Sequence, residues 1–171
     1  MPVNIRVPRR TLLVLCGSAG SGKSTFAAQH FGATPTTSVS SDQCRALICD
    51  DPNNQQANLD TFDLFYYIIN KRLLNGRFTV ADSTALRPDA RRRLWELARR
   101  HGYLACLLVF NIPPELCLER DQQRTRQVGP QVIAYHAGLF QQALLTIPNE
   151  GWDAVHILTG NDIDIAIEVE D

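Results

Sequence analysis

The sequence has 171 residues, 44% of them hydrophobic, and a formal net charge of −1 at pH 7. This length suits one compact α/β domain, so we expect residues 1–171 to form a single domain. No apolar run approaches the roughly 20 residues that cross a bilayer, and the first residues lack the apolar core of a signal peptide. These features predict no membrane partner and a cytoplasmic location.

The cysteines are odd in number and form no C-x-x-C pair. We therefore expect them to be reduced core residues rather than disulfide partners or metal ligands. They are Cys16, Cys44, Cys49, Cys106 and Cys117.

Along the chain, apolar runs of strand length alternate with segments of helical period. This alternation is typical of a parallel sheet with crossover helices, an α/β fold. The predicted strands are 11–16, 36–40, 77–82, 103–110 and 154–158. The predicted helices are 24–30, 57–75, one opened by Pro88, one from Pro113 and Pro114 towards Arg124, and one striped from Val132 to Ala143.

The phosphate-binding pattern G-x-x-x-x-G-K-[ST] lies between the first predicted strand and helix, as Gly17-Ser18-Ala19-Gly20-Ser21-Gly22-Lys23-Ser24. Glycines let backbone N–H groups turn towards a polyphosphate, and the following helix N-terminus adds partial positive charge. Lys23 can reach the β- and γ-phosphates, and the Ser24 hydroxyl can ligate Mg²⁺. We expect this P-loop, with Thr25, to bind ATP or another nucleoside triphosphate with Mg²⁺. The alternative is a Gly/Ser-rich turn with a purely geometric role.

A second polar cluster, Ser40-Ser41-Asp42-Gln43-Cys44-Arg45, follows the predicted strand 36–40. Ligands of open α/β sheets bind at the carboxyl ends of the strands, so Asp42 should face the phosphate site. A carboxylate there can accept the proton of an attacking hydroxyl. The alternative is structural: Ser41 or Asp42 caps the next helix, and Arg45 pairs with Asp42 at i, i+3. The residues alone leave both interpretations open.

Arginines are concentrated between residues 87 and 126, where nine of them stand against five acidic residues. Arg120 and Arg124 are four residues apart and should share one face of a helix, with Arg126 close behind. Small P-loop kinases use such a lid because charge on the transferring phosphoryl group must be neutralised while water is excluded. The alternative is a solvated arginine face paired with Glu119 and Asp121.

One further residue carries a weaker signal. Asp82 ends the predicted strand 77–82 and is a candidate for holding Mg²⁺ through water, or alternatively for pairing with Arg87 in the loop. His136 falls within the apolar stripe of its predicted helix, so we expect a structural role for it.

Several segments together resemble the polynucleotide 5′-kinase domain of the bacterial polynucleotide kinase-phosphatase enzymes of RNA repair. The similarity runs in order over almost the whole chain. It rests on the P-loop, Ser40-Ser41-Asp42-x-Cys44-Arg45, Asp50-Asp51-x-x-x-Gln55, Tyr67-Ile-Ile-x-Lys71-Arg72-Leu73, Val80-x-Asp82-x-Thr84, Val109-Phe110-Asn111-Ile112-Pro113 and the Arg120, Arg124 and Arg126 lid.

This resemblance implies a P-loop NTPase-type parallel sheet with a helical lid, and transfer of the γ-phosphate of an NTP to a 5′-OH end of RNA or DNA. By the same resemblance, Asp42 is the general base, Arg45 holds the acceptor phosphate, and the three lid arginines act on the γ-phosphate. Family members carry a phosphatase domain and a ligase-like domain downstream and act with a methyltransferase of RNA 3′ ends. The chain is thus expected to be the N-terminal module of a longer enzyme.

Two other functions are compatible with the P-loop. One is a kinase of a small hydroxylated metabolite, in which Asp42 and Arg45 bind that compound. The other is a nucleotide-switched binding module without an acceptor. The arginine excess weighs against the first, and a carboxylate aimed at an acceptor weighs against the second.

Overall fold

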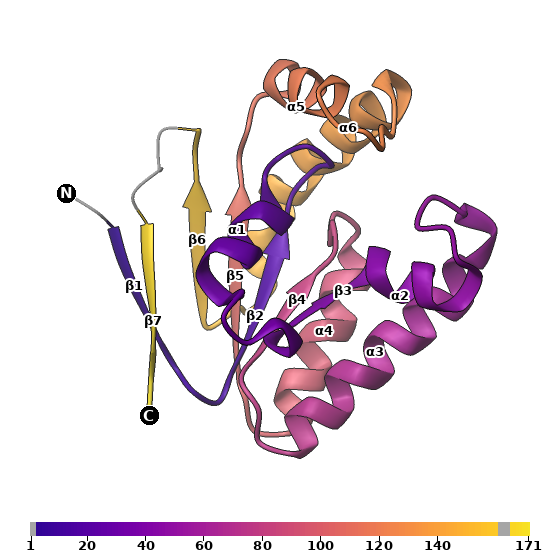
Figure 1. Ribbon diagram of the computed structural model, residues 1–171. Helices are drawn as coiled ribbons and strands as arrows, with labels where there is room; N and C mark the ends of the chain where they lie inside the picture. The colour runs from indigo at the N-terminus through magenta and orange to yellow at the C-terminus, as the bar shows by residue number, and fades with distance from the viewer. Residues whose placement is uncertain (1–2, 161–164) are drawn as a thin grey trace.

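The computed structural model of the protein describes residues 3–160 and 165–171. A five-stranded parallel sheet in the order β3-β4-β2-β5-β6 forms the centre (Figure 1). Its strands are β2 (Thr11–Cys16), β3 (Ser38–Ser40), β4 (Thr79–Asp82), β5 (Leu104–Phe110) and β6 (Ala154–Leu158). The five predicted strands are confirmed, with starts at most two residues later than expected.

Within residues 3–160 and 165–171, six α-helices and three short 3₁₀ helices (η) connect the strands. They are α1 (Lys23–Phe31), η1 (Pro35–Thr37), α2 (Ser41–Cys49), η2 (Gln55–Ala57), α3 (Asn58–Leu74), α4 (Pro88–Arg100), α5 (Pro114–Gln122), α6 (Pro130–Thr146) and η3 (Ile147–Asn149). Prolines open α4, α5 and α6, where a missing N–H is tolerated. In the described part of the chain, no helix is long and apolar enough to cross a membrane.

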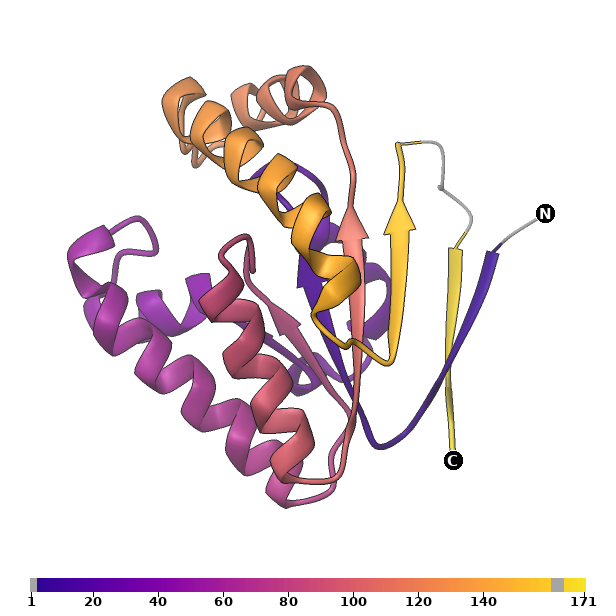
Figure 2. The same cartoon turned by 180° about the vertical axis from the view of Figure 1, so that it is seen from behind.

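The side chains of β2 alternate between the two faces of the sheet, and different elements cover each face. Leu12 and Val14 pack towards α3, α4 and α6, which lie in front of the sheet in Figure 2. Leu13 and Leu15 pack towards α1 and a separate pair of strands. All six residues of β2 are buried, as expected for a central strand covered on both faces.

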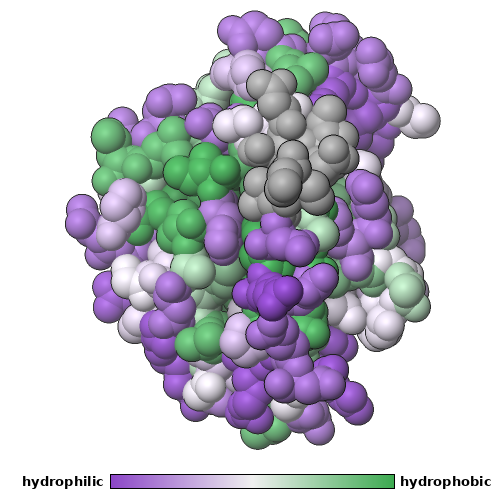
Figure 3. All heavy atoms as spheres, turned by 90° about the vertical axis from the view of Figure 1, so that its left-hand side faces the viewer, coloured by the Kyte–Doolittle hydropathy of each residue, from purple (hydrophilic) through white to green (hydrophobic). Residues whose placement is uncertain are grey.

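The separate pair consists of β1 (Val3–Pro8) and β7 (Ile165–Glu170), parallel to each other and not predicted above. Ile5 and Ile165 belong to the core on the α1 side. Arg6 pairs with Glu168 at 3.4 Å on the outer side. Figure 3 views this side and shows hydrophilic residues over its lower centre and an apolar patch at its left. These two strands therefore complete the core on the α1 side of the sheet.

Candidate active site

The P-loop connects β2 to α1 and takes its shape from two glycines. Gly20 and Gly22 have φ values of 79° and 97°, a region in which residues with a Cβ are strained. A Cβ on Gly20 would lie 2.5 Å from the backbone oxygen of Cys117 in α5. The loop therefore needs glycine there both for its backbone conformation and for the close approach of α5.

Lys23 and Asp82 form the buried charged part of the loop region, at 8% and 6% exposure. The Lys23 ammonium donates to the carbonyl of Ser18 at 2.9 Å, and the Ser24 hydroxyl donates to Asp82 Oδ2 at 2.9 Å. Burial lowers the pKa of Lys23, an effect that the Asp82 charge opposes. Burial raises the pKa of Asp82, and Lys23 and the Ser24 hydrogen bond oppose that change. Asp82 thus contacts Ser24 and not Arg87, which pairs with Asp89.

A cavity of about 550 Å³ opens beside the loop. Arg120 lies on its wall and donates from Nη1 to the Ser21 carbonyl at 3.2 Å. Arg124 lines the same cavity. Two of the three lid arginines therefore face the phosphate-binding loop. The polar lining residues from α1 are Lys23, Ser24, Thr25, Gln29 and His30.

The helical part of the lid segment is shorter than predicted, because α5 ends at Gln122 and Arg124 lies beyond it. Asp121 determines how the chain continues. Its buried carboxylate accepts hydrogen bonds from the N–H groups of Val128 and Gly129 at 2.9 and 3.0 Å. The expected alternative, in which Asp121 pairs with lid arginines, is wrong; the residue instead closes the loop that precedes α6.

Asp42 lies in the first turn of α2 between two guanidinium groups. Arg45 Nη1 is 3.2 Å from one carboxylate oxygen, and Arg126 Nη2 is 2.8 Å from the other. The helix cap is Ser40, whose hydroxyl accepts from the N–H of Gln43. The capping interpretation of Ser41 and Asp42 is therefore wrong, whereas the expected Arg45 ion pair is present.

Arg45 and Arg126 are also held by other residues around Asp42. Arg45 is almost fully buried and donates from Nη2 to Asn58 Oδ1 at 2.6 Å. Arg126 Nη1 donates to the carbonyl of Pro52 at 3.3 Å. The third lid arginine thus contacts Asp42 and the 52–53 segment rather than the P-loop. Asn58 was not identified from the sequence, where nothing marks an asparagine at a helix start as an arginine partner.

The Asp42 cluster and the P-loop lie on one edge of the sheet. Ser40 at the end of β3 is opposite Asp82 at the end of β4, and Asp82 is opposite Leu15 of β2. The Asp42 charge reaches both buried groups: it adds to burial in raising the pKa of Asp82, and it opposes burial at Lys23. The predicted proximity of Asp42 to the phosphate site follows from this register.

His136 of α6 is a contact of the loop that the sequence did not predict. Its Nδ1 accepts a hydrogen bond from the backbone N–H of Ala19 at 3.2 Å. Helical period placed it correctly in the inward stripe of α6, but no local pattern signals a contact with a loop 117 residues away.

The sequence profile of a family described as an AAA domain matches residues 12–142. A gluconokinase from Sinorhizobium meliloti 1021 is 16% identical, with a TM-score of 0.60 over 90% of this chain and 85% of that one. A putative kinase from Chloroflexus aurantiacus j-10-fl is 14% identical, with a TM-score of 0.66 over 89% and 86% of the two chains.

A chain of the Pnkp1/Rnl/Hen1 RNA repair complex is 23% identical, with a TM-score of 0.63 over 82% of this chain and 46% of that one. No curated protein matches the sequence. At these identities the structures establish the fold of P-loop kinases. The family profile spans most of the chain, including the P-loop and the lid, and the protein belongs to this AAA domain family.

Proposed function

We propose that the protein is a polynucleotide 5′-hydroxyl kinase, which transfers the γ-phosphate of ATP or another NTP to a 5′-OH end of RNA or DNA. The observation that carries the proposal is the position of Asp42 between Arg45 and Arg126, on the same sheet edge as Lys23. A nucleic-acid end brings a phosphate close to its 5′-hydroxyl, and guanidinium groups suit phosphate. The RNA repair chain among the structural neighbours supports the same acceptor.

The donor half of the reaction uses the P-loop. Backbone N–H groups of the loop and Lys23 bind the triphosphate, and Ser24 with Asp82 would hold Mg²⁺. Their oxygen atoms, 2.9 Å apart, are the hard donors that Mg²⁺ prefers. When bound, the metal neutralises charge on the β- and γ-phosphates.

The acceptor half uses Asp42 as the general base. Asp42 accepts the proton of the 5′-hydroxyl while the hydroxyl oxygen forms a bond to the γ-phosphorus. The bond from that phosphorus to the β,γ-bridging oxygen breaks, and a nucleoside diphosphate leaves. Arg120 and Arg124, which line the donor cavity, stabilise the charge on the transferring group. Arg45 holds the acceptor phosphate.

A second candidate is a kinase of a small hydroxylated metabolite. The gluconokinase neighbour favours it, since the likeness covers 85% of that chain against 46% of the RNA repair chain. In this case Asp42 would still be the base, and Arg45 would bind the metabolite. The two candidates differ in whether the acceptor is a polyanion, which experiment distinguishes directly.

The test is incubation of the protein with γ-labelled ATP, Mg²⁺ and a short single-stranded oligonucleotide that ends in a 5′-hydroxyl or a 5′-phosphate. Asp42→Asn removes the base while keeping its size, and Asp63→Asn on the exposed side of α3 is the matched control. We expect label only on the 5′-hydroxyl strand. Transfer should be lost in Asp42→Asn, with ATP affinity retained, and unchanged in Asp63→Asn.

Two results would contradict the proposal. Transfer at a near-normal rate by Asp42→Asn would exclude Asp42 as the base. Failure to label any oligonucleotide, RNA or DNA, with intact ATP binding would exclude the polynucleotide acceptor. The second result would favour the metabolite kinase, for which a set of hydroxylated compounds replaces the oligonucleotide.

A further inference from the structure

The P-loop is fixed by contacts from three other parts of the chain. Its first residue, Gly17, donates from its N–H to the carbonyl of Thr84 in the β4–α4 loop at 2.9 Å. Gly20 lies against the backbone of Cys117 in α5. The third contact is the Ala19 N–H to His136 Nδ1 hydrogen bond from α6. This last bond is made by a side chain outside the loop, as is the bond from Arg120 of α5 to the Ser21 carbonyl.

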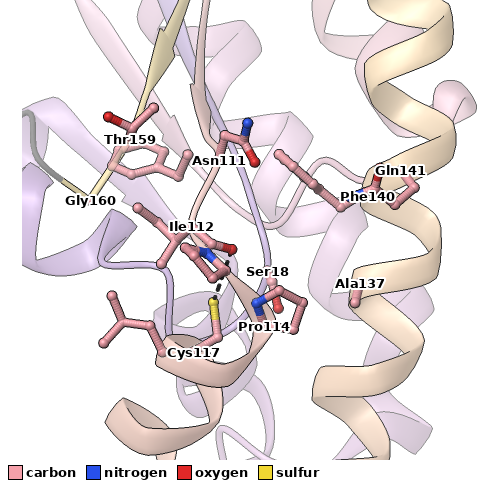
Figure 4. A pocket seen from close by; sticks show the side chains of 13 residues that line it. Ser18, Asn111, Ile112, Pro114, Cys117, Ala137, Phe140, Gln141, Thr159 and Gly160 are labelled. Carbon is pink, nitrogen blue, oxygen red and sulfur yellow. Dashed lines mark hydrogen bonds between the residues drawn. The ribbon is translucent and has the colours of Figure 1, made fainter.

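The loop lies between the two helices that flank the lid. Figure 4 shows Ser18 between the α5 segment that carries Cys117 and the α6 segment that carries Ala137, the neighbour of His136. These residues line a second cavity of about 500 Å³ on this side of the loop. Any movement of α6 relative to the loop must therefore stretch or break the His136 bond.

His136 can act as an acceptor only while Nδ1 carries no proton. Burial, with a smaller contribution from the charge of Lys23, lowers the pKa of His136 to about 4. The ring is consequently neutral near pH 7, and the geometry assigns its proton to Nε2. The contact is a neutral hydrogen bond that persists over the physiological range.

A bound triphosphate requires several loop N–H groups to point inward together. A loop that is ordered before binding loses less conformational entropy when the ligand binds. We propose that His136 is a positioning residue for the donor nucleotide: it accepts the Ala19 N–H and holds the leading turn of the P-loop in its phosphate-binding shape. This inference rests on the proposed nucleotide-dependent function and adds a residue outside the known loop pattern.

Two amide variants test the position of the acceptor atom. In His136→Asn the amide oxygen is attached to Cγ, as Nδ1 is, and can take the same bond. In His136→Gln the oxygen lies one carbon farther out and can reach that place only through a different side-chain conformation. His156→Asn, a partly exposed histidine of β6, is the control for a general effect of histidine removal.

The measurement is ATP affinity by calorimetry without any acceptor, followed by KM for ATP and kcat with the acceptor identified above. We expect His136→Gln to weaken ATP affinity by about tenfold and His136→Asn by no more than about threefold. His156→Asn should match the unchanged protein. The KM for ATP should follow the same order, with the KM for acceptor unchanged.

Equal ATP affinities for His136→Gln and the unchanged protein would overturn the proposal. Equal weakening by Asn and Gln would overturn it as well, since that pattern reports loss of the ring and not of the acceptor atom. Because ATP affinity is measured without acceptor, a wrong assignment of the polynucleotide substrate would leave this result intact. The two proposals therefore fail separately.

Discussion

The proposed donor and acceptor halves of the candidate site are built differently. In the donor half, Lys23 and Asp82 are almost fully buried, and the P-loop is held by backbone contacts and by the His136 and Arg120 side chains. In the acceptor half, the Asp42 side chain is 49% exposed and is held by ion pairs to Arg45 and Arg126. The donor half is thus ready for its ligand, whereas the acceptor half must exchange ion pairs to admit one.

This difference indicates how each half achieves specificity. A triphosphate meets N–H groups and a charge already in place, so its binding needs little rearrangement. An acceptor must separate Arg126 from Asp42, and a partly exposed ion pair of this kind costs little to break. Because Arg126 also contacts the 52–53 segment, the lid loop and the entrance to Asp42 should move together.

The prediction with the largest expected effect tests whether the donor half depends on the buried charge of Lys23. Lys23→Ala should reduce kcat/KM for transfer by about a thousandfold or more, because the triphosphate loses its principal cation. Lys71 is the other lysine of the sequence and lies on the exposed side of α3, so Lys71→Ala should retain normal activity. Steady-state kinetics would check both. Retention of a tenth of the activity by Lys23→Ala would contradict the predicted role.

A second prediction tests whether the donor half depends on its backbone. Gly20→Ala places a Cβ 2.5 Å from the Cys117 oxygen at a φ of 79°, so the loop or α5 must move. We expect ATP affinity to fall on the order of a hundredfold. Gly138→Ala in α6 meets nothing within 4 Å and is the matched control. Calorimetry of both variants would decide, and normal ATP affinity of Gly20→Ala would show that the loop is not preformed.

The same division explains what the sequence could predict. The place of the P-loop between β2 and α1 follows from one contiguous pattern, and that of Asp82 from the end of a buried strand, but the contacts with Ser24 and His136 were not predicted. The acceptor half depends on contacts between Arg126 and Asp42, 84 residues apart, and only family resemblance indicated that they share a site. That resemblance placed Arg126 with the γ-phosphate, whereas it contacts Asp42.

Strands β1 and β7 were missed for a related reason. Ile5 and Val7 alternate with Arg6, a pattern compatible with a strand, but each run is short, and in the described residues it pairs with a strand at the other end of the sequence. Local patterns predict elements that sit within the alternating strand and helix order. They do not predict a pair that forms only when the two ends of the chain meet.

A third prediction tests whether Arg126 belongs to the acceptor half. Arg126→Ala removes a guanidinium that can bind the acceptor phosphate once it has left Asp42, so it should raise the KM for a 5′-hydroxyl oligonucleotide by about tenfold, leave ATP affinity unchanged and reduce the salt dependence of acceptor binding. Arg124→Ala should weaken ATP affinity and leave the KM for the oligonucleotide unchanged, since Arg124 lines the donor cavity. Titrations of each ligand at two salt concentrations separate the variants. Weaker ATP affinity in Arg126→Ala with normal acceptor KM would move Arg126 to the donor half.

The smallest expected effect concerns pH and the support of the donor half by a neutral ring. The pKa of His136 is lowered from 6.5 to about 4 in the folded protein, so the unfolded chain binds a proton more readily. The stability gained from the neutral ring is complete above pH 6.5 and is lost as pH falls towards 4.

At pH 5 the full shift would correspond to about 2 kcal/mol, and partial exposure of the ring reduces this to about 1 kcal/mol. Between pH 7.5 and 5, the unchanged protein should therefore lose about 1 kcal/mol more free energy of unfolding than His136→Asn, which has no titrating ring. Urea unfolding of both proteins at the two pH values measures this difference. Equal losses of unfolding free energy in the two proteins would mean that His136 is protonated as easily in the folded protein as in the unfolded chain. The Ala19 bond would then not hold the neutral ring in place.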